Sequence, residues 1–212
     1  MRDKEVTGGV TPLRIGLEVG STWVFASAVD WPGWCRRGKG EELAVACLLE
    51  YAPRYKPVAG RGFRSGSPEI VGRVRGNATT DFGAPGMPGP WDDEPLDARE
   101  TARQVRLLRA AWVAFDAAAA AAPRMLPKGP RGGGRDRDGI IEHTREAERS
   151  YARKLGVRLP PRTPWEEQRD AIADALRRGG AGAGRAWSPR YLIRRTAWHV
   201  LDHAWELEDK TP

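Results

Sequence analysis

Two histidines stand four residues apart in the segment WHVLDHAWE at 198–206, and the chain has only one other histidine, His143. On an α-helix, residues i and i+4 lie about 6 Å apart along the axis and about 40° apart around it, so His199 and His203 can share one ion. Packed helices lie about 8–10 Å apart, so a histidine on a second helix can join them. Small residues such as Ala147 share the face of His143 and leave room for an ion and a ligand. Three histidines with an open fourth position are typical of a catalytic zinc site, and imidazole also suits nickel, iron and cobalt.

Charged residues near this pattern are candidates for supporting roles. A carboxylate from Glu206 or Asp202 could hold a ring N–H of a histidine and fix its tautomer. Arg195 precedes His199 by one helical turn, and its guanidinium could bind an anionic substrate. The alternatives are ordinary: a histidine pair at this spacing is often a plain polar pair, and solubility alone explains many acidic residues.

The N-terminal part predicts a small α+β unit over residues 1–76. Residues 13–29 are rich in aromatic and β-branched types and predict two strands joined by a Gly-Ser turn. A helix is expected within 38–55, with Cys47 on its apolar face, and a further strand over 69–76. The Pro/Gly-rich stretch 77–94 is expected to be a linker.

Residues 95–212 predict four helices. Asp97 is a candidate N-cap of a helix ending near 122, and a second helix is expected over about 137–155. Thr163 with Glu166 predicts a capping box, and Ser188 followed by proline predicts the start of the last helix. Four helices with a long first connection are typical of a four-helix bundle, which makes the whole chain α+β.

The segments IIEHTREAERSYARKLG and YLIRRTAWHVLDHAWELED together resemble the DinB-like metal-binding four-helix bundle family, which is related to the mycothiol-dependent maleylpyruvate isomerases. The resemblance covers about 95–212. That family has one histidine on its second helix and H-x-x-x-H on its last, and His143, His199 and His203 match these positions. It implies a bound divalent metal, commonly zinc or nickel, and an activity using a low-molecular-weight thiol such as mycothiol. The chain departs from the family in its added N-terminal unit.

That unit is itself similar to the HicB-like fold, over about residues 13–76. The similarity lies in VFASAVDWPGWCRRGKGEELAVACLLEY, where a strand ends in a Pro-Gly turn, a short basic stretch follows and a helix opens with glutamates. In HicB antitoxins this unit binds a partner toxin and a separate segment binds DNA. The sequence contains no separate DNA-binding helix pair, and an accessory or packing role is the simpler expectation.

Composition limits the remaining classes of function. The chain carries 35 Lys and Arg against 28 Asp and Glu, a formal charge of +7, but these charges are not concentrated on one segment. The pattern argues against nucleic acid as a partner, with the basic loop at 124–137 as the one candidate contact. Two cysteines give no disulfide framework, and no apolar run approaches the roughly 20 residues of a membrane span. The first ten residues lack the apolar core of a signal peptide, so a cytoplasmic protein is expected.

These observations predict a divalent-metal-dependent enzyme that acts on a small-molecule substrate, as a thiol-dependent transferase or isomerase or as a hydrolase. Zinc is the expected metal, with nickel or iron as alternatives. The predicted ligands are His143, His199 and His203. The predicted catalytic residues are Arg195, Glu206 and Asp202. The alternative is a non-catalytic partner-binding or regulatory module that keeps a relic metal site. The oligomeric state stays open, with a homodimer as one option.

Overall fold

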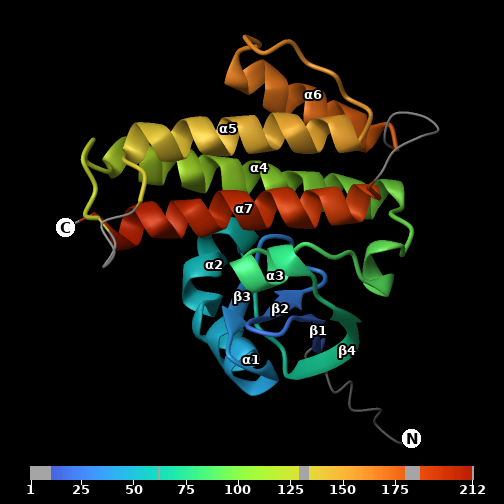
Figure 1. Cartoon of the computed structure of the whole chain (residues 1–212). Helices are drawn as coiled ribbons and strands as arrows, with labels where there is room; N and C mark the ends of the chain where they lie inside the picture. The colour runs from blue at the N-terminus through green and yellow to red at the C-terminus, as the bar shows by residue number, and fades with distance from the viewer. Residues whose placement is uncertain (1–10, 62, 129–133, 180–186, 212) are drawn as a thin grey trace, which may run out of the picture.

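A four-stranded mixed sheet with its helices forms the N-terminal part of the protein, and long helices form the C-terminal part (Figure 1). The computed structural model describes residues 11–61, 63–128, 134–179 and 187–211. The predicted α+β class is confirmed. Within the described residues, no helix has the length and apolar character needed to cross a membrane.

The sheet has the strand order β3-β2-β1-β4. Its strands are β1 (Leu13–Val19), β2 (Val24–Ala28), β3 (Cys35–Gly38) and β4 (Pro68–Arg75). The first three are antiparallel neighbours, whereas β4 runs parallel to β1. The strands expected within 13–29 and 69–76 are confirmed. Strand β3 was not expected, because CRRG has no alternation of apolar residues; it forms by pairing with β2 across the Pro-Gly turn.

The single helix expected within 38–55 is two helices, α1 (Glu41–Glu50) and α2 (Ala52–Ala59). The expected buried face of α1 is also wrong. Ala44 and Leu48 are buried, Cys47 is only half-buried, and Leu43 is 59% exposed. Every residue from 43 to 49 is apolar, so hydrophobic periodicity could not mark the inner face.

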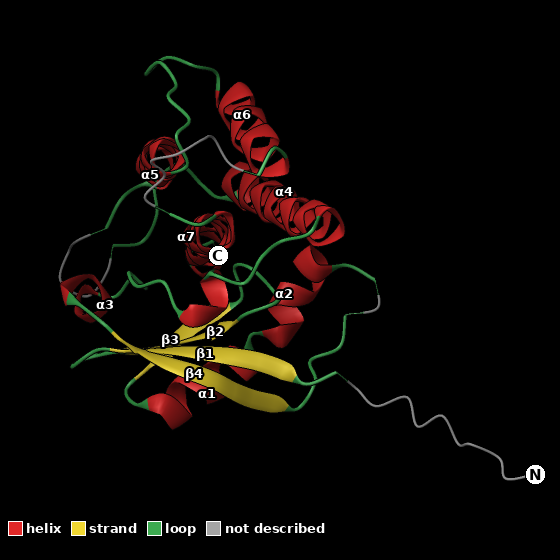
Figure 2. Ribbon diagram, turned by 90° about the vertical axis from the view of Figure 1, so that its right-hand side faces the viewer, coloured by secondary structure: helices red, strands yellow, loops and turns green. Residues whose placement is uncertain are grey.

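Both faces of the sheet are covered. Val24 and Ala26 belong to the same core as Ala44 of α1, whereas Phe25, on the opposite face of β2, meets Trp198 edge-on at 6.1 Å between ring centroids. Trp198 belongs to the last helix, α7 (Pro189–Asp209), so the sheet lies between α1 and α7 (Figure 2).

The segment 77–94, expected to be a linker, has regular structure and packs on the sheet. It contains α3 (Ala78–Phe82), capped by Asn77, and a 3₁₀ turn at Pro90–Asp92. Trp91 is buried against β1, where a Cβ added at Gly16 would lie 2.4 Å from the indole ring. The abundant Gly and Pro predicted the turns of this segment correctly, but they gave no sign that Trp91 among them is buried.

Four helices build the C-terminal part: α4 (Ala98–Ala121), α5 (Arg137–Lys154), α6 (Trp165–Arg177) and α7. They contact one another in a ring, α4 to α7 to α5 to α6 and back to α4, as in a four-helix bundle. The caps at Asp97 and Ser188 are confirmed. The capping box at Thr163 is wrong, because the Thr163 hydroxyl donates to the carbonyl of Pro160 and α6 begins only after Pro164.

Helix α7 is the central element, enclosed by the sheet on one side and by α4 and α5 on the other (Figures 1 and 2). A buried ion pair fixes it against the 3₁₀ turn: Arg194 donates to both carboxylate oxygens of Asp92, at 2.9 and 2.6 Å. Such a pair holds only if both partners stay in place, since either charge alone would be buried without compensation. The rotation of α7 about its axis is therefore defined, and with it the direction of each of its side chains.

Candidate metal centre

The three histidines of the chain come together between α5 and α7. Each offers one ring nitrogen to a group in which the three atoms lie within 4.8 Å of one another. The Nε2 atoms of His143 and His199 are 3.2 Å apart. Tetrahedral zinc with Zn–N bonds of about 2.0–2.1 Å separates its nitrogen ligands by roughly 3.4 Å. This pair already has about that separation, and the ring nitrogen that His203 offers lies within 4.8 Å of both.

Helix direction explains this convergence. Helix α5 runs antiparallel to α7 (Figure 1), so its first turns lie beside the last turns of α7. His143 is near the start of α5, whereas His199 is at the middle of α7 and His203 is one turn further toward its end. Ring centroids are 5.0 Å apart for His143 and His199, and 5.1 Å for His143 and His203.

Burial favours the neutral, metal-binding form of two of the imidazole rings, those of His199 and His143. It lowers the pKa of His199 well below its usual value, and the nearby His203 and Arg195 add to this effect. Burial also lowers the pKa of His143, with Arg135 contributing next. Both rings are therefore neutral near pH 7, and a neutral imidazole offers its lone pair to a metal ion.

Glu206 is placed to orient His203. Its Oε2 lies 2.8 Å from Nδ1 of His203, and this bond is the main reason why the pKa of Glu206 falls to about 2. An ionised carboxylate accepts the Nδ1–H and leaves Nε2 of the same ring free to bind an ion. The geometry is compatible with the orienting role predicted for Glu206, which stays a prediction.

Asp202 lies elsewhere, which corrects the prediction that it could orient a histidine. Its Oδ1 accepts a hydrogen bond of 2.9 Å from Arg36 on β3. Each residue turns an α-helix by about 100°, so the side chain next to His203 points away from α5 and toward the sheet. Asp202 thus joins the two parts of the fold and does not contact the three histidines.

Arg195 lies beside the histidines and is buried, with only 9% of its surface exposed. Its guanidinium packs on Trp198 and on Tyr151 of α5, at 4.5 and 5.2 Å from the ring centroids. Tyr151 itself lies 5.9 Å from His199 between ring centroids. Tyr151 was not predicted as a site residue, although it follows His143 by eight residues, a spacing that returns a side chain to about the same face of a helix.

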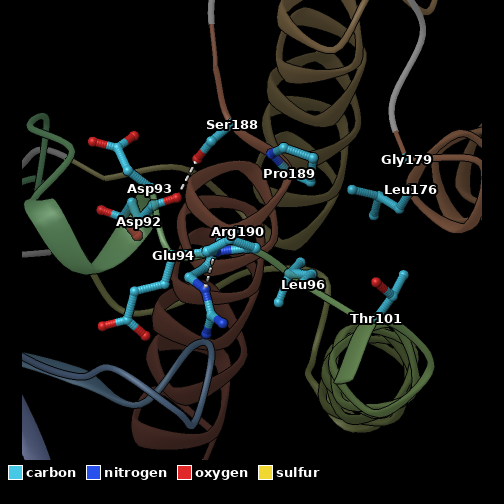
Figure 3. Close-up of a pocket in the computed structure, with 11 residues that line it drawn as sticks. Asp92, Asp93, Glu94, Leu96, Thr101, Leu176, Gly179, Ser188, Pro189 and Arg190 are labelled. Carbon is cyan, nitrogen blue, oxygen red and sulfur yellow. Dashed lines mark hydrogen bonds between the residues drawn. The ribbon is translucent and has the colours of Figure 1, made fainter. Parts of the chain in front are cut away.

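A separate cavity of about 330 Å³ lies at the first turn of α7, away from the histidines (Figure 3). Asp92, Asp93 and Glu94 lie on one side of it, and Leu96, Thr101 and Leu176 on the other. Ser188 and Arg190 also line it, and they donate hydrogen bonds to the carbonyls of Asp92 and Glu94. The cavity wall carries more acidic than basic side chains and has no histidine, so it is distinct from the candidate metal centre.

The basic loop at 124–137 can be placed only in part, because 129–133 lie outside the described residues. Arg137 donates to the carbonyl of Ala122 and thereby ties the end of the loop to α4. The candidate contact with nucleic acid therefore stays a prediction.

Comparisons with known proteins give no match: no family model matches the chain, and neither does any curated protein or solved structure. The fold and the site therefore define an α+β protein with a three-histidine cluster that could hold a metal ion. The DinB-like and HicB-like resemblances remain predictions from the sequence.

Proposed function

We propose that the protein is a divalent-metal-dependent enzyme, with His143, His199 and His203 as the metal ligands and zinc as the metal. The observation that carries the proposal is the convergence of three imidazoles from two helices to within 4.8 Å. Following the DinB-like resemblance, we propose a transferase or isomerase that uses a low-molecular-weight thiol such as mycothiol, or a hydrolase.

The ligand set supports a catalytic site over a structural one. Structural zinc sites usually have four protein ligands, whereas catalytic sites have three and leave one position open. Among the described residues, the group holds three histidines only. The nearest acid, Glu206, is engaged by His203, and the buried thiol of Cys35 lies on the sheet, 3.1 Å from the hydroxyl of Ser27.

A bound divalent ion would act as a Lewis acid and would lower the pKa of a water or thiol in its open position. The residues of this chain provide the setting for that chemistry. Glu206 orients His203, burial keeps His199 neutral, and the ion pair of Arg194 with Asp92 fixes the helix that carries both histidines.

For the N-terminal unit we propose an accessory role, namely to support α7. Trp198 packs on Phe25, Trp205 meets Tyr51 at 5.1 Å between ring centroids, and Asp202 binds Arg36. Trp198, Asp202 and Trp205 follow one another at three- and four-residue spacing, so they share the face of α7 that meets the N-terminal unit.

Metal analysis of the purified protein, followed by a thiol-transfer screen with several low-molecular-weight thiols, tests the proposal. We expect about one equivalent of zinc, lost in His199→Ala and kept in the matched variant Asp202→Ala. Less than roughly a tenth of an equivalent, unchanged by His199→Ala, would contradict a metal site. A full equivalent of metal without turnover of any thiol or ester would favour a non-catalytic module with a relic site.

A further inference from the structure

Two rows of side chains face each other along the contact between α5 and α7. On α7 the row is Arg195, His199 and His203, and on α5 it includes His143 and Tyr151, with the small Ala147 between them. Residues four apart on a helix are stacked on one face about 6 Å apart. The metal ligands thus occupy one end of the rows, and Arg195 with Tyr151 lies one turn further along.

Arg195 is a buried cation without an acidic partner among the described residues. Its Nη1 is buried and has no hydrogen-bond acceptor there. Its neighbour Arg194, by contrast, has the carboxylate of Asp92. Buried charges in proteins are normally paired, because removing an uncompensated charge from water is strongly unfavourable. Arg195 hydrogen-bonds to Tyr151 but has no counter-charge in the described part of the chain, and its buried Nη1 lacks an acceptor, so its position beside the candidate metal centre points to an anion that is supplied by a ligand.

The charges around the histidines favour the same conclusion. Arg195 and Arg135 both act on His199 as nearby positive charges. Among the described residues, the acid that is hydrogen-bonded to the cluster is Glu206, and it is already paired with His203 and with Lys210. With a divalent ion added, the centre would have a clear excess of positive charge, which an anionic ligand would neutralise.

We propose that Arg195 and Tyr151 form an anion subsite that binds the carboxylate of a small substrate while a donor atom of the same substrate reaches the three-histidine centre. Arg195 would bind the carboxylate through its planar fork, and the Tyr151 hydroxyl would donate to it. One helical turn, about 6 Å, separates the subsite from His199, which corresponds to roughly three or four covalent bonds in the substrate. The location of the donor atom rests on the proposed function, whereas the anion subsite does not.

The test compares two thiols of equal length, 3-mercaptopropionate and the uncharged 3-mercapto-1-propanol. They are titrated into the full-length protein loaded with Co²⁺, whose visible absorption reports binding of a thiolate to the ion. The wild-type protein should bind the carboxylate roughly 10- to 150-fold more tightly, the range given by a charge-assisted hydrogen bond. Equal affinity for the two thiols in the wild-type protein would overturn the subsite.

Variants assign the preference to specific residues. Arg195→Gln should abolish the preference for the carboxylate thiol without changing the Co²⁺ spectrum of the thiol-free protein. The control Arg153→Gln, which changes an exposed arginine of α5, should keep this preference. Tyr151→Phe should lower it about 2- to 12-fold, the effect of one neutral hydrogen bond, and serves as the test if Arg195→Gln does not fold. An unchanged preference for the carboxylate thiol in Arg195→Gln would also overturn the proposal. If Arg195→Gln does not fold, an unchanged preference in Tyr151→Phe would overturn it.

A metal-free arm separates this proposal from the proposed function. If the protein binds no Co²⁺, the proposed function fails, and the subsite is tested with propionate against propanol at constant ionic strength. Propionate should then raise the melting temperature of the metal-free wild-type protein, because a ligand that binds only the folded state stabilises it. Arg195→Gln should lack this effect. An equal response of the two proteins to propionate would overturn the subsite.

Discussion

Removing the Glu206 carboxylate should weaken metal binding without removing any metal ligand. Its Oε2 holds Nδ1 of His203 at 2.8 Å, and this bond fixes both the orientation and the tautomer of the ring. Loss of such a supporting carboxylate typically costs 10- to 100-fold in metal affinity. Glu206→Ala should therefore raise the Kd for zinc by about 10- to 100-fold, which corresponds to about 1.4–2.7 kcal/mol.

Glu206→Gln and Asp202→Ala are the matched controls. The glutamine keeps a hydrogen-bond acceptor but loses the charge, so it should give an intermediate Kd. Asp202 is only one residue from His203 but pairs with Arg36, and 40% of its side chain is exposed. Breaking an exposed pair of this kind should cost about 0–1 kcal/mol of stability and leave the Kd for zinc unchanged.

Competition titration against a chromophoric chelator at pH 7 measures these Kd values. The order wild type and Asp202→Ala, then Glu206→Gln, then Glu206→Ala is the expected result, from tightest to weakest. If Asp202→Ala weakened zinc binding as much as Glu206→Ala, or if neither had an effect, the assignment of Glu206 as the residue that orients His203 would be refuted.

Three further predictions concern stability. Asp92→Ala leaves Arg194 buried and unpaired, so it should lower the free energy of unfolding by about 3–5 kcal/mol and the melting temperature by about 6–20 °C. The control Asp93→Ala changes the exposed neighbouring residue and should change the free energy of unfolding by less than about 0.5 kcal/mol. Gly16→Ala should cost about 1–3 kcal/mol in urea unfolding, because its Cβ would meet an indole ring at 2.4 Å. The metal-free protein should lose stability as the pH falls below about 6.5, because His199 binds a proton in the unfolded chain but not when it is buried in the folded protein. The free energy of unfolding should change by at most about 1.4 kcal/mol per pH unit for this one proton, and this dependence should be weaker in His199→Ala. A slope that did not change in this variant would show that other groups control the acid response.

Much of the candidate site could be predicted from the sequence because it depends on local geometry. The i, i+4 spacing of His199 and His203 fixes their shared direction once the segment is helical, and the Ser188 cap marks where that helix begins. The convergence of His143 also required α5 to run beside α7, which the four-helix pattern predicted.

What the sequence could not supply depends on tertiary packing. Asp202 and Glu206 both lie within one helical turn of His203, so the sequence does not distinguish them. The position of β3 does, because Arg36 on that strand binds Asp202, whereas Glu206 binds His203. Strand β3 has no hydrophobic alternation of its own and is formed by its partner. The burial of Trp91 could not be predicted from its Gly/Pro-rich segment either, because it depends on the space that Gly16 of β1 leaves for the indole ring.

X-ray absorption spectroscopy of the zinc-loaded protein tests the central claim most directly. The account predicts one ion per chain with scattering from three imidazoles at about 2.0–2.1 Å and one further light ligand. Sulfur scattering at about 2.3 Å, fewer than three imidazoles, or no bound ion would contradict it.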